Sequence, residues 1–194
     1  MSNSKLVCYT KKSLNTSGRR NHKIDYITPH CVVGQVSVET LGQILYPRSR
    51  GASSNYGIGS DGRIGLYVDE KNRSWCSSSK TNDDRAITIE CASDLSSPYR
   101  MNNAVYESLI NLCVDICKRH KKRKLIWIPN KEKALSYCLK SDEMLITVHR
   151  WYANKSCPGE WLYSRLDDLC TEVNKKLNPV KPKRKRARSK NFSA

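Results

Sequence analysis

The sequence predicts an α/β fold, in which one domain holds a central mixed β-sheet flanked by α-helices. Short β-rich segments alternate along the chain with segments whose apolar residues recur at helical spacing, the pattern of a sheet covered by helices. A chain of 194 residues can bury about two-thirds of its unfolded surface around one core. The sequence shows no internal repeat, and its apolar runs fall short of the roughly 18 residues of a transmembrane helix. We therefore expect no membrane span.

A strand and a short helix are predicted first along the chain. Residues 24–33 carry β-forming residues at alternating positions and predict a strand, with His30 near its end. Residues 37–46 begin with Ser37, a suitable N-cap, carry valine and leucine at helical spacing, and stop at Pro47. A helix is therefore expected directly after the strand.

A hairpin and a further strand are predicted next. Residues 56–59 and 64–68 flank an Asp-Gly pair, which suits a tight turn between antiparallel strands. Residues 85–92 alternate isoleucine and cysteine on one face with threonine and Glu90 on the other. An acid on an otherwise apolar strand is a candidate functional residue.

The second half of the sequence predicts three helices and a strand. Residues 102–120 have apolar side chains at a period near 3.6 and predict a long amphipathic helix. A short helix over residues 131–139 and a strand over residues 144–149 follow, so that His149 ends the last strand. Leucines at helical spacing predict a closing helix from Pro158 to residue 177, with the proline in its first turn.

Positive charge is concentrated in two blocks. The chain carries a net charge of +17, and residues 179–194 hold seven lysines and arginines and no acid. Such a segment cannot bury a core, so we predict a folded domain over residues 1–178 and a disordered basic tail or linker over residues 179–194. The block at residues 118–124 is interpreted as a solvated helix end and loop. The excess charge predicts a polyanionic partner, and nucleic acid, anionic membrane and cell wall all qualify.

The chain contains nine cysteines at irregular spacings, and no signal-like apolar stretch is seen near Met1. This pattern indicates synthesis in a reducing compartment, without a disulfide scaffold. One cysteine, Cys157, precedes a Pro-Gly pair, and the other eight are interpreted as buried thiols. If the strands that end at His30 and His149 are neighbours, these two imidazoles and Cys157 converge into a set that leaves a fourth tetrahedral position free, the layout of a catalytic zinc site. Spacing alone does not select this triple, because four histidines and nine cysteines form many others.

Four motifs occur in an order that resembles a known family. They are Thr28-Pro29-His30; Ala52-Ser53-Ser54-Asn55-Tyr56-Gly57-Ile58-Gly59 with Asp61-Gly62-Arg63-Ile64; Arg85-Ala86-Ile87-Thr88-Ile89-Glu90; and His149 followed by Cys157-Pro158-Gly159. Together they resemble the zinc-dependent N-acetylmuramoyl-L-alanine amidases, a group that includes phage endolysins and is related to peptidoglycan recognition proteins. The resemblance covers residues 24–174 and implies an amidase-like catalytic domain.

The resemblance implies a Zn²⁺ site at His30, His149 and Cys157. It also places Glu90 as the acid that moves the proton and Lys155 and Tyr56 near the scissile amide. Such roles agree with general chemistry, because a carboxylate with a raised pKa can shuttle protons and a cation can stabilise a developing oxyanion. Trp75 is a candidate wall of the substrate groove.

Structural interpretations of these residues stay open at the sequence level. Tyr56 could be a core-edge aromatic, Lys155 a surface lysine and Trp75 a packing residue. An unpaired Glu90 favours function, since a buried acid without a partner is costly. His22 and His120 have polar or basic neighbours and are predicted to be exposed.

The resemblance implies a monomeric peptidoglycan hydrolase of a bacteriophage, without specific nucleic-acid binding. The lack of a signal-like segment fits an endolysin that stays in the host cytoplasm until it is released to the wall, whose anionic polymers the basic tail could bind. Three alternatives stay open. They are a non-catalytic peptidoglycan-binding protein of the same fold, a cysteine peptidase in which His149 activates Cys157, and a nucleic-acid-binding protein.

Overall fold

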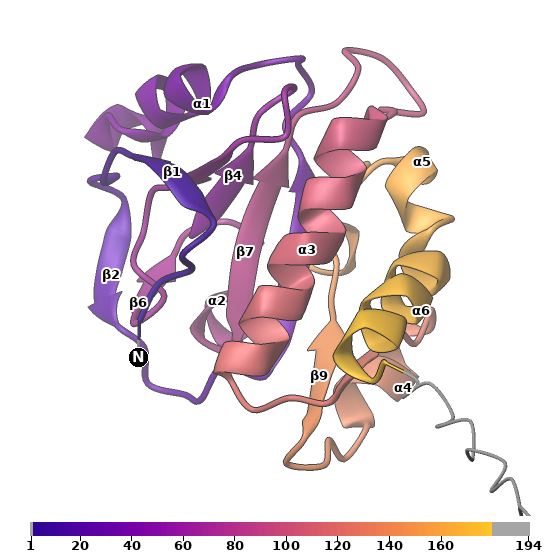
Figure 1. Cartoon of the computed structure of the whole chain (residues 1–194). Coiled ribbons are helices and arrows are strands. Elements are labelled where there is room, and N and C mark those ends of the chain that lie inside the picture. Colours follow the sequence, from indigo (N-terminus) through magenta and orange to yellow (C-terminus); the bar gives the residue numbers. More distant parts are fainter. Residues whose placement is uncertain (1, 180–194) are drawn as a thin grey trace, which may run out of the picture.

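A seven-stranded mixed sheet forms the centre of the protein, whose structure, a computed structural model, describes residues 2–179 (Figure 1). In order across the sheet the strands are β1 (Val7–Thr10), β5 (Ile64–Leu66), β4 (Tyr56–Ile58), β7 (Ala86–Cys91), β3 (Tyr26–Cys31), β9 (Glu143–Ile146) and β8 (Lys124–Ile126). The β4–β5 pair is antiparallel and the other neighbours are parallel. A separate antiparallel pair joins β2 (Thr16–Arg19) to β6 (Asn72–Ser74). The predicted mixed sheet is confirmed.

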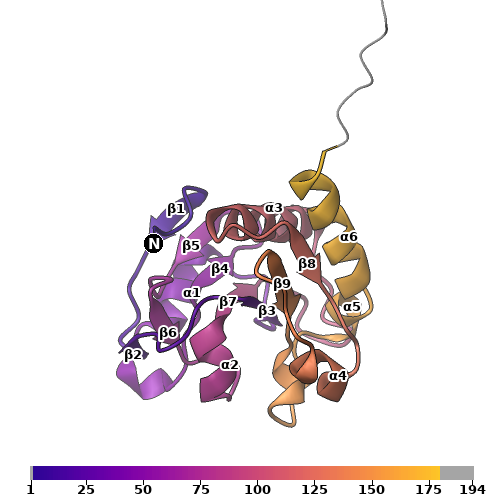
Figure 2. The ribbon, with the colours of Figure 1, turned by 90° about the horizontal axis from the view of Figure 1, so that it is seen from below.

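Helices cover both sides of this sheet. They are α1 (Val38–Leu45), α2 (Lys80–Arg85), α3 (Asn103–Arg119), α4 (Lys131–Ser136), α5 (Glu160–Tyr163) and α6 (Leu166–Leu177), with 3-10 turns η1 (Arg48–Arg50) and η2 (His149–Trp151). Figure 2 shows α3 and α6 on one side of the sheet and α2 and α4 on the other. Side chains cap four of the helices: Ser37, as predicted, and Ser79, Asn102 and Asn130 each accept a hydrogen bond from a backbone N–H of the first turn.

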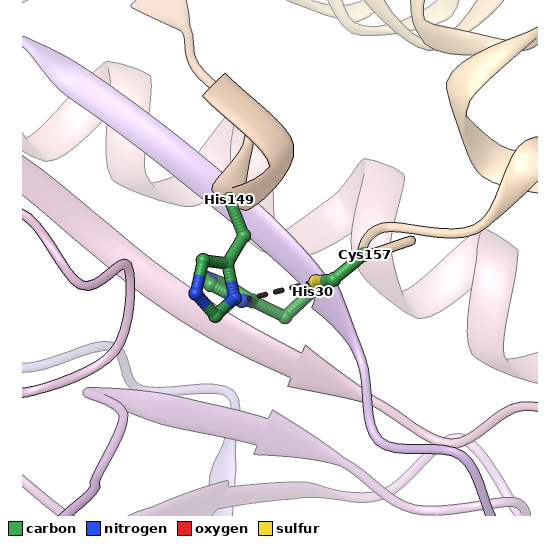
Figure 3. A group of neighbouring side chains, drawn as sticks. All are labelled: His30, His149 and Cys157. Atoms are coloured by element: carbon green, nitrogen blue, oxygen red, sulfur yellow. Dashed lines mark hydrogen bonds between the residues drawn. The ribbon is translucent and has the colours of Figure 1, made fainter. Parts of the chain in front are cut away.

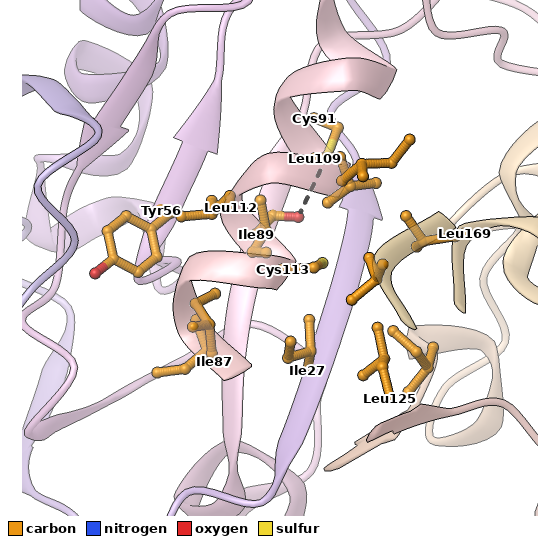
Figure 4. Packing of buried hydrophobic residues seen from close by; sticks show 14 of the residues in the cluster. Ile27, Tyr56, Ile87, Ile89, Cys91, Leu109, Leu112, Cys113, Leu125 and Leu169 are labelled. Carbon is orange, nitrogen blue, oxygen red and sulfur yellow. Dashed lines mark hydrogen bonds between the residues drawn. The ribbon is translucent and has the colours of Figure 1, made fainter. Parts of the chain in front are cut away.

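The main core lies between the sheet and the helices α3 and α6 (Figure 4). Residues of β7 alternate as predicted, since Ile87 and Ile89 are fully buried in this core while Glu90 points to the opposite side. The central pair β3–β7 runs in register over six residues, from Tyr26 beside Ala86 to Cys31 beside Cys91. Because side chains of paired positions lie on the same face, this register places His30 next to Glu90.

Two predicted boundaries are wrong. Strand β9 ends at Ile146, and His149 begins the turn η2 instead of ending the strand. The closing helix is two helices, α5 and α6, and Pro158 precedes both. Gly159 adopts φ +84°, which a helix interior does not permit, so α5 begins only after it.

Two interpretations of individual residues are also wrong. His120 is not exposed; its Nε2 lies 2.9 Å from the buried Glu70 carboxylate, beside the ion pair of Arg119 with the same group. The basic block at residues 118–124 is therefore only partly solvated. Cys8 and Cys138 are exposed instead of buried.

Several short elements had no sequence signal, namely β1, β2, β6, β8 and α2, each of six residues or fewer. Among residues 2–179 no helix has both the length and the apolar character that crossing a membrane requires. From residue 180 onward the predicted basic tail lies outside the described residues.

Candidate metal centre and groove

Two histidines and a cysteine converge at the carboxyl ends of β3 and β9 (Figure 3). His30 lies near the end of β3, His149 opens η2, and Cys157 lies in the loop before α5. Strands β3 and β9 are parallel neighbours, as the convergence required. One potential ligand atom from each residue lies within 4.8 Å of the other two. The Cys157 Sγ is 3.2 Å from His30 Nδ1, and the two imidazole centroids are 5.1 Å apart.

Protonation of this cluster follows from its burial. His30 is 1% exposed, and burial together with the neighbouring His149 holds its pKa well below the ordinary value. Burial and the charge of Lys155 likewise lower the pKa of His149. Contact with Cys31 and burial raise the pKa of Cys157. Both imidazoles are thus neutral at neutral pH, the form that binds a metal.

The cluster suits a metal ion on chemical grounds. His30 Nε2 is buried and has no hydrogen-bond partner among the described residues. Two imidazoles and a thiolate are the donors that zinc prefers, and three protein ligands are the number found in catalytic sites.

A charged side chain ties the segments that carry the ligands together. The Arg150 guanidinium donates to Glu160 Oε1 at 2.7 Å and to the Ser156 carbonyl oxygen at 2.5 Å. The backbone N–H of Arg150 also donates to the carbonyl oxygen of Cys157 at 3.1 Å. These bonds hold the loop of Cys157 against the turn that begins with His149.

A buried network of hydrogen bonds joins β3, the segment after β9 and α2 next to the site. Thr28 on β3 and Thr147 after β9 share a hydrogen bond of 2.7 Å between their hydroxyls. Asn82 of α2 joins both threonines, at 3.1 and 2.8 Å, and accepts a hydrogen bond of 3.1 Å from the Tyr152 hydroxyl. Satisfied networks of this kind fix the relative positions of the elements that carry them.

Glu90 lies beside the cluster, as the β3–β7 register requires. The Cys76 thiol donates to Glu90 Oε1 at 3.8 Å, whereas Oε2 is buried without a hydrogen-bond partner among residues 2–179. Arg85, the cation closest in sequence, pairs instead with Asp25 at 2.6 Å. Burial raises the pKa of Glu90 to about 7, although Cys76 and Arg50 oppose the shift. A carboxyl with this pKa can both accept and release a proton near neutrality.

Two surface cavities of about 400 and 660 Å³ meet at this site. Four residues line both cavities: Arg50, Glu90, His149 and Lys155. Trp75 lines the smaller one, and its indole N–H donates to the Ser17 hydroxyl at 2.6 Å. The structure therefore brings Glu90, Lys155 and Trp75 to the groove that contains the metal-ligand candidates.

Arg50 is a site residue that the sequence did not indicate. It is exposed and belongs to the turn η1, where two arginines and a serine give no recognisable motif. Its proximity to Glu90 follows only from the folded arrangement, because 40 residues separate the two positions.

Tyr56 does not lie at the site. Its side chain is fully buried on the side of the sheet that faces α3 (Figure 4). The hydroxyl donates to Glu70 Oε1 at 2.6 Å and accepts a hydrogen bond from the Ser4 N–H at 2.9 Å. The expected position beside the scissile bond is wrong because Tyr56 pairs with Ile89, a core residue, and not with Glu90.

The chain is similar to known amidases and endolysins in its sequence family and in its fold. A family model described as N-acetylmuramoyl-L-alanine amidase matches residues 20–160. A mutant endolysin from Bacillus subtilis has a similar structure, with a TM-score of 0.60 and 13% identity over 85% of this chain and 97% of that chain. The N-acetylmuramoyl-L-alanine amidase LysC from Clostridium intestinale has a TM-score of 0.59 and 15% identity over 86% of this chain and 96% of that chain.

A Drosophila peptidoglycan recognition protein, PGRP-SA, has a TM-score of 0.54 and 15% identity over 81% of this chain and 85% of that chain. Likeness at such identities shows the fold. A search of curated protein sequences found no match. The family model spans most of the chain and includes His30, Glu90, His149 and Cys157. The chain therefore belongs to the N-acetylmuramoyl-L-alanine amidase family.

Proposed function

We propose that this protein is a zinc-dependent peptidoglycan hydrolase that cleaves the amide bond between N-acetylmuramic acid and L-alanine. The observation that carries the proposal is the convergence of His30, His149 and Cys157 next to the Glu90 carboxyl, in a groove open to a polymeric substrate. Membership of the amidase family supports the same reaction.

His30, His149 and Cys157 would hold the zinc ion. When bound, zinc supplies Lewis-acid chemistry, which polarises a carbonyl group and lowers the pKa of water towards about 7. The ligands' own positions are set by the Arg150 hydrogen bonds and the threonine–asparagine network, so little reorganisation is needed when the ion binds.

Three other residues would act on the substrate. Glu90 accepts a proton from the attacking water and passes it to the leaving amine of L-alanine, which its pKa of about 7 permits in both directions. Lys155, exposed at the junction of the two cavities, stabilises the negative charge that develops on the amide oxygen. Trp75 forms a wall of the groove for glycan or peptide. Tyr56 has no part in this mechanism.

A cysteine-nucleophile mechanism is the second candidate, because Cys157 Sγ lies 3.2 Å from His30 Nδ1. The alternative assumed that His149 activates Cys157, but the histidine in contact with the Cys157 thiol is His30. A nucleophilic cysteine needs a lowered pKa, whereas the surroundings of Cys157 raise it. Activity that is lost on alkylation but resists a strong chelator would favour the nucleophile.

Product analysis of digested peptidoglycan tests the proposed reaction. Mass spectrometry should find new free amino groups on L-alanine and intact glycan strands, after treatment with the zinc-loaded protein. New reducing sugar ends would contradict the proposal. A protein that binds peptidoglycan without releasing either product would be the non-catalytic binder of the same fold.

The proposal extends to the biological setting of the enzyme. Residues 1–178 form the catalytic domain, and the protein acts as a monomeric bacteriophage endolysin that reaches the wall from the host cytoplasm when the membrane is opened. Addition of the purified protein to cells with a permeabilised membrane should lower the turbidity of the suspension. If the protein hydrolyses isolated walls but leaves the turbidity of such cells unchanged, the lytic role is contradicted.

A further inference from the structure

A separate pocket, distinct from the two cavities at the candidate metal centre, lies at the opposite end of the sheet. It has a volume of about 730 Å³ and is lined by residues 19–24, which lead into β3, and by Lys71 and Asn72 at the start of β6. His30 lies at the other end of β3, about 20 Å away at the rise of a β-strand. This pocket shares no lining residue with the two cavities of the candidate active site.

The pocket is basic and contains no acidic residue. Its basic lining consists of Arg19, Arg20, Lys23 and Lys71, with the imidazole of His22 beside them. Four acids near the pocket pair with cations outside it: Asp25 with Arg85, Asp69 with Lys12, Glu70 with Arg119 and Asp84 with Arg73. Asp84 Oδ1 also accepts a hydrogen bond of 3.4 Å from the N–H of Asn21 in the lining. Among residues 2–179, none of the four lysine and arginine side chains of the pocket lies within ion-pair distance of a carboxylate.

A buried arginine gives the basic pocket a fixed floor. Arg20 is 9% exposed, and its guanidinium donates to the Glu70 carbonyl oxygen at 2.7 Å, to Asn55 Oδ1 at 2.9 Å and to the Asp83 carbonyl oxygen. All three acceptors are uncharged and orient the guanidinium without an ion pair, although the carboxylates of Asp83, Glu70 and Asp84 lie near enough to interact with it. The Arg20 N–H also donates to the Lys71 carbonyl oxygen at 3.1 Å, which joins the two segments of the lining.

Hydrogen-bond donors of the lining are unused. In the described part of the chain, the backbone N–H groups of His22 and Lys23 have no acceptor. The side-chain amide of Asn72 has none either, and β2–β6 pairing places Asn72 opposite Arg19. Cations combined with free backbone and amide N–H groups form the donor set that phosphate oxygens accept.

We propose that this basic pocket binds the phosphodiester groups of an anionic wall polymer and anchors the enzyme to the wall while the metal centre acts on peptidoglycan. The choice of a wall polymer over other phosphodiesters rests on the proposed function. The lining agrees with that choice, since it has no phenylalanine, tyrosine or tryptophan on which a nucleic-acid base could stack, and His22 is its one aromatic ring.

Titration of the full-length, ¹⁵N-labelled protein with poly(glycerol phosphate) tests the site directly. The amide resonances of His22 and Lys23 should shift, and those of residues around His149 should not. Affinity should fall about tenfold in an Arg19→Ala/Lys71→Ala double variant, since two charged contacts are lost. The matched control is Lys118→Ala/Lys133→Ala, which removes the same charge from exposed positions on α3 and α4 and should change affinity by less than about twofold.

Two results would overturn the proposal. Equal losses in both double variants would mean that net charge alone, and not this pocket, binds the polymer. Equal affinity and equal shifts with a DNA duplex at the same phosphate concentration would overturn the choice of a wall polymer. Neither measurement requires hydrolysis, so failure of the proposed amidase activity would be seen separately, in the product analysis.

Discussion

Glu90 allows the strongest test of the site, because the proton-carrier role proposed for it depends on a raised pKa that stability measurements can detect. The ordinary carboxyl pKa is 4.5, and burial raises that of Glu90 to about 7 in the folded protein. Between these two values the folded state holds a proton that the unfolded state releases, so the free energy of unfolding falls as the pH rises. A pKa shift of this size corresponds to a loss of about 3 kcal/mol in the free energy of unfolding once the pH is above 7. We expect a loss of about 2 kcal/mol, because the Glu90 side chain is only partly enclosed.

Glu90→Gln removes this effect and keeps the shape of the side chain. We expect urea unfolding, measured with a chelator present, to show that the variant gains about 2 kcal/mol relative to the wild type between pH 4.5 and pH 8. Other titrating groups cancel in the difference between the two proteins. Parallel pH profiles would refute the raised pKa, and with it the assignment of Glu90 as a group that both accepts and releases a proton. On peptidoglycan, the variant should lose about 10²- to 10⁴-fold in kcat.

Four further substitutions separate the site from the scaffold. Cys157→Ser should abolish stoichiometric zinc binding, measured by metal analysis after dialysis, and activity with it; a variant that retains the metal would contradict its role as a ligand. Lys155→Ala should lower kcat about 10- to 100-fold with a small change in KM, and an effect on KM alone would indicate substrate binding instead. Tyr56→Phe should leave kcat unchanged and cost about 1–3 kcal/mol in urea unfolding, because the buried hydrogen bonds to Glu70 and from the Ser4 N–H are both lost; a large loss of kcat would return this residue to the active site. Glu70→Gln should cost about 3 kcal/mol at pH 7, since it leaves the Arg119 guanidinium without its buried partner, and a change below about 0.5 kcal/mol would show that the pair is solvated.

The sequence predicted the strands at the centre of the sheet because these depend on local patterns, whereas the metal-ligand set was implied by the family resemblance and stays a prediction. Alternation along residues 85–92 requires Ile87 and Ile89 to share one face and Glu90 to take the other, whatever the neighbouring strands are. The position of His30 beside Glu90 then requires that their strands pair in parallel and in the register that the structure shows, and the sequence pattern does not fix that register.

Prediction failed where the answer depends on partners distant in the sequence. Either face of the hairpin that carries Tyr56 could have met the core, and pairing with Ile89 decides which one does. The basic block that contains His120 has the composition of a solvated loop, and its burial depends on Glu70, which lies 50 residues away. Arg50 reaches the groove through an exposed turn that carries no hydrophobic pattern.

Electrostatics link the fold of this site to its chemistry. Before a metal binds, both imidazoles are neutral and Cys157 keeps its proton, so these three residues bury no charge. That state costs little, because the desolvation penalty falls mainly on ionised groups. Coordination requires the thiolate, so metal binding must release the Cys157 proton. Glu90, which has a carboxyl oxygen within 4.8 Å of a ring nitrogen of His30, has a pKa of about 7 and can take up such a proton, so the same residue would suit both metal loading and proton transfer to the leaving amine.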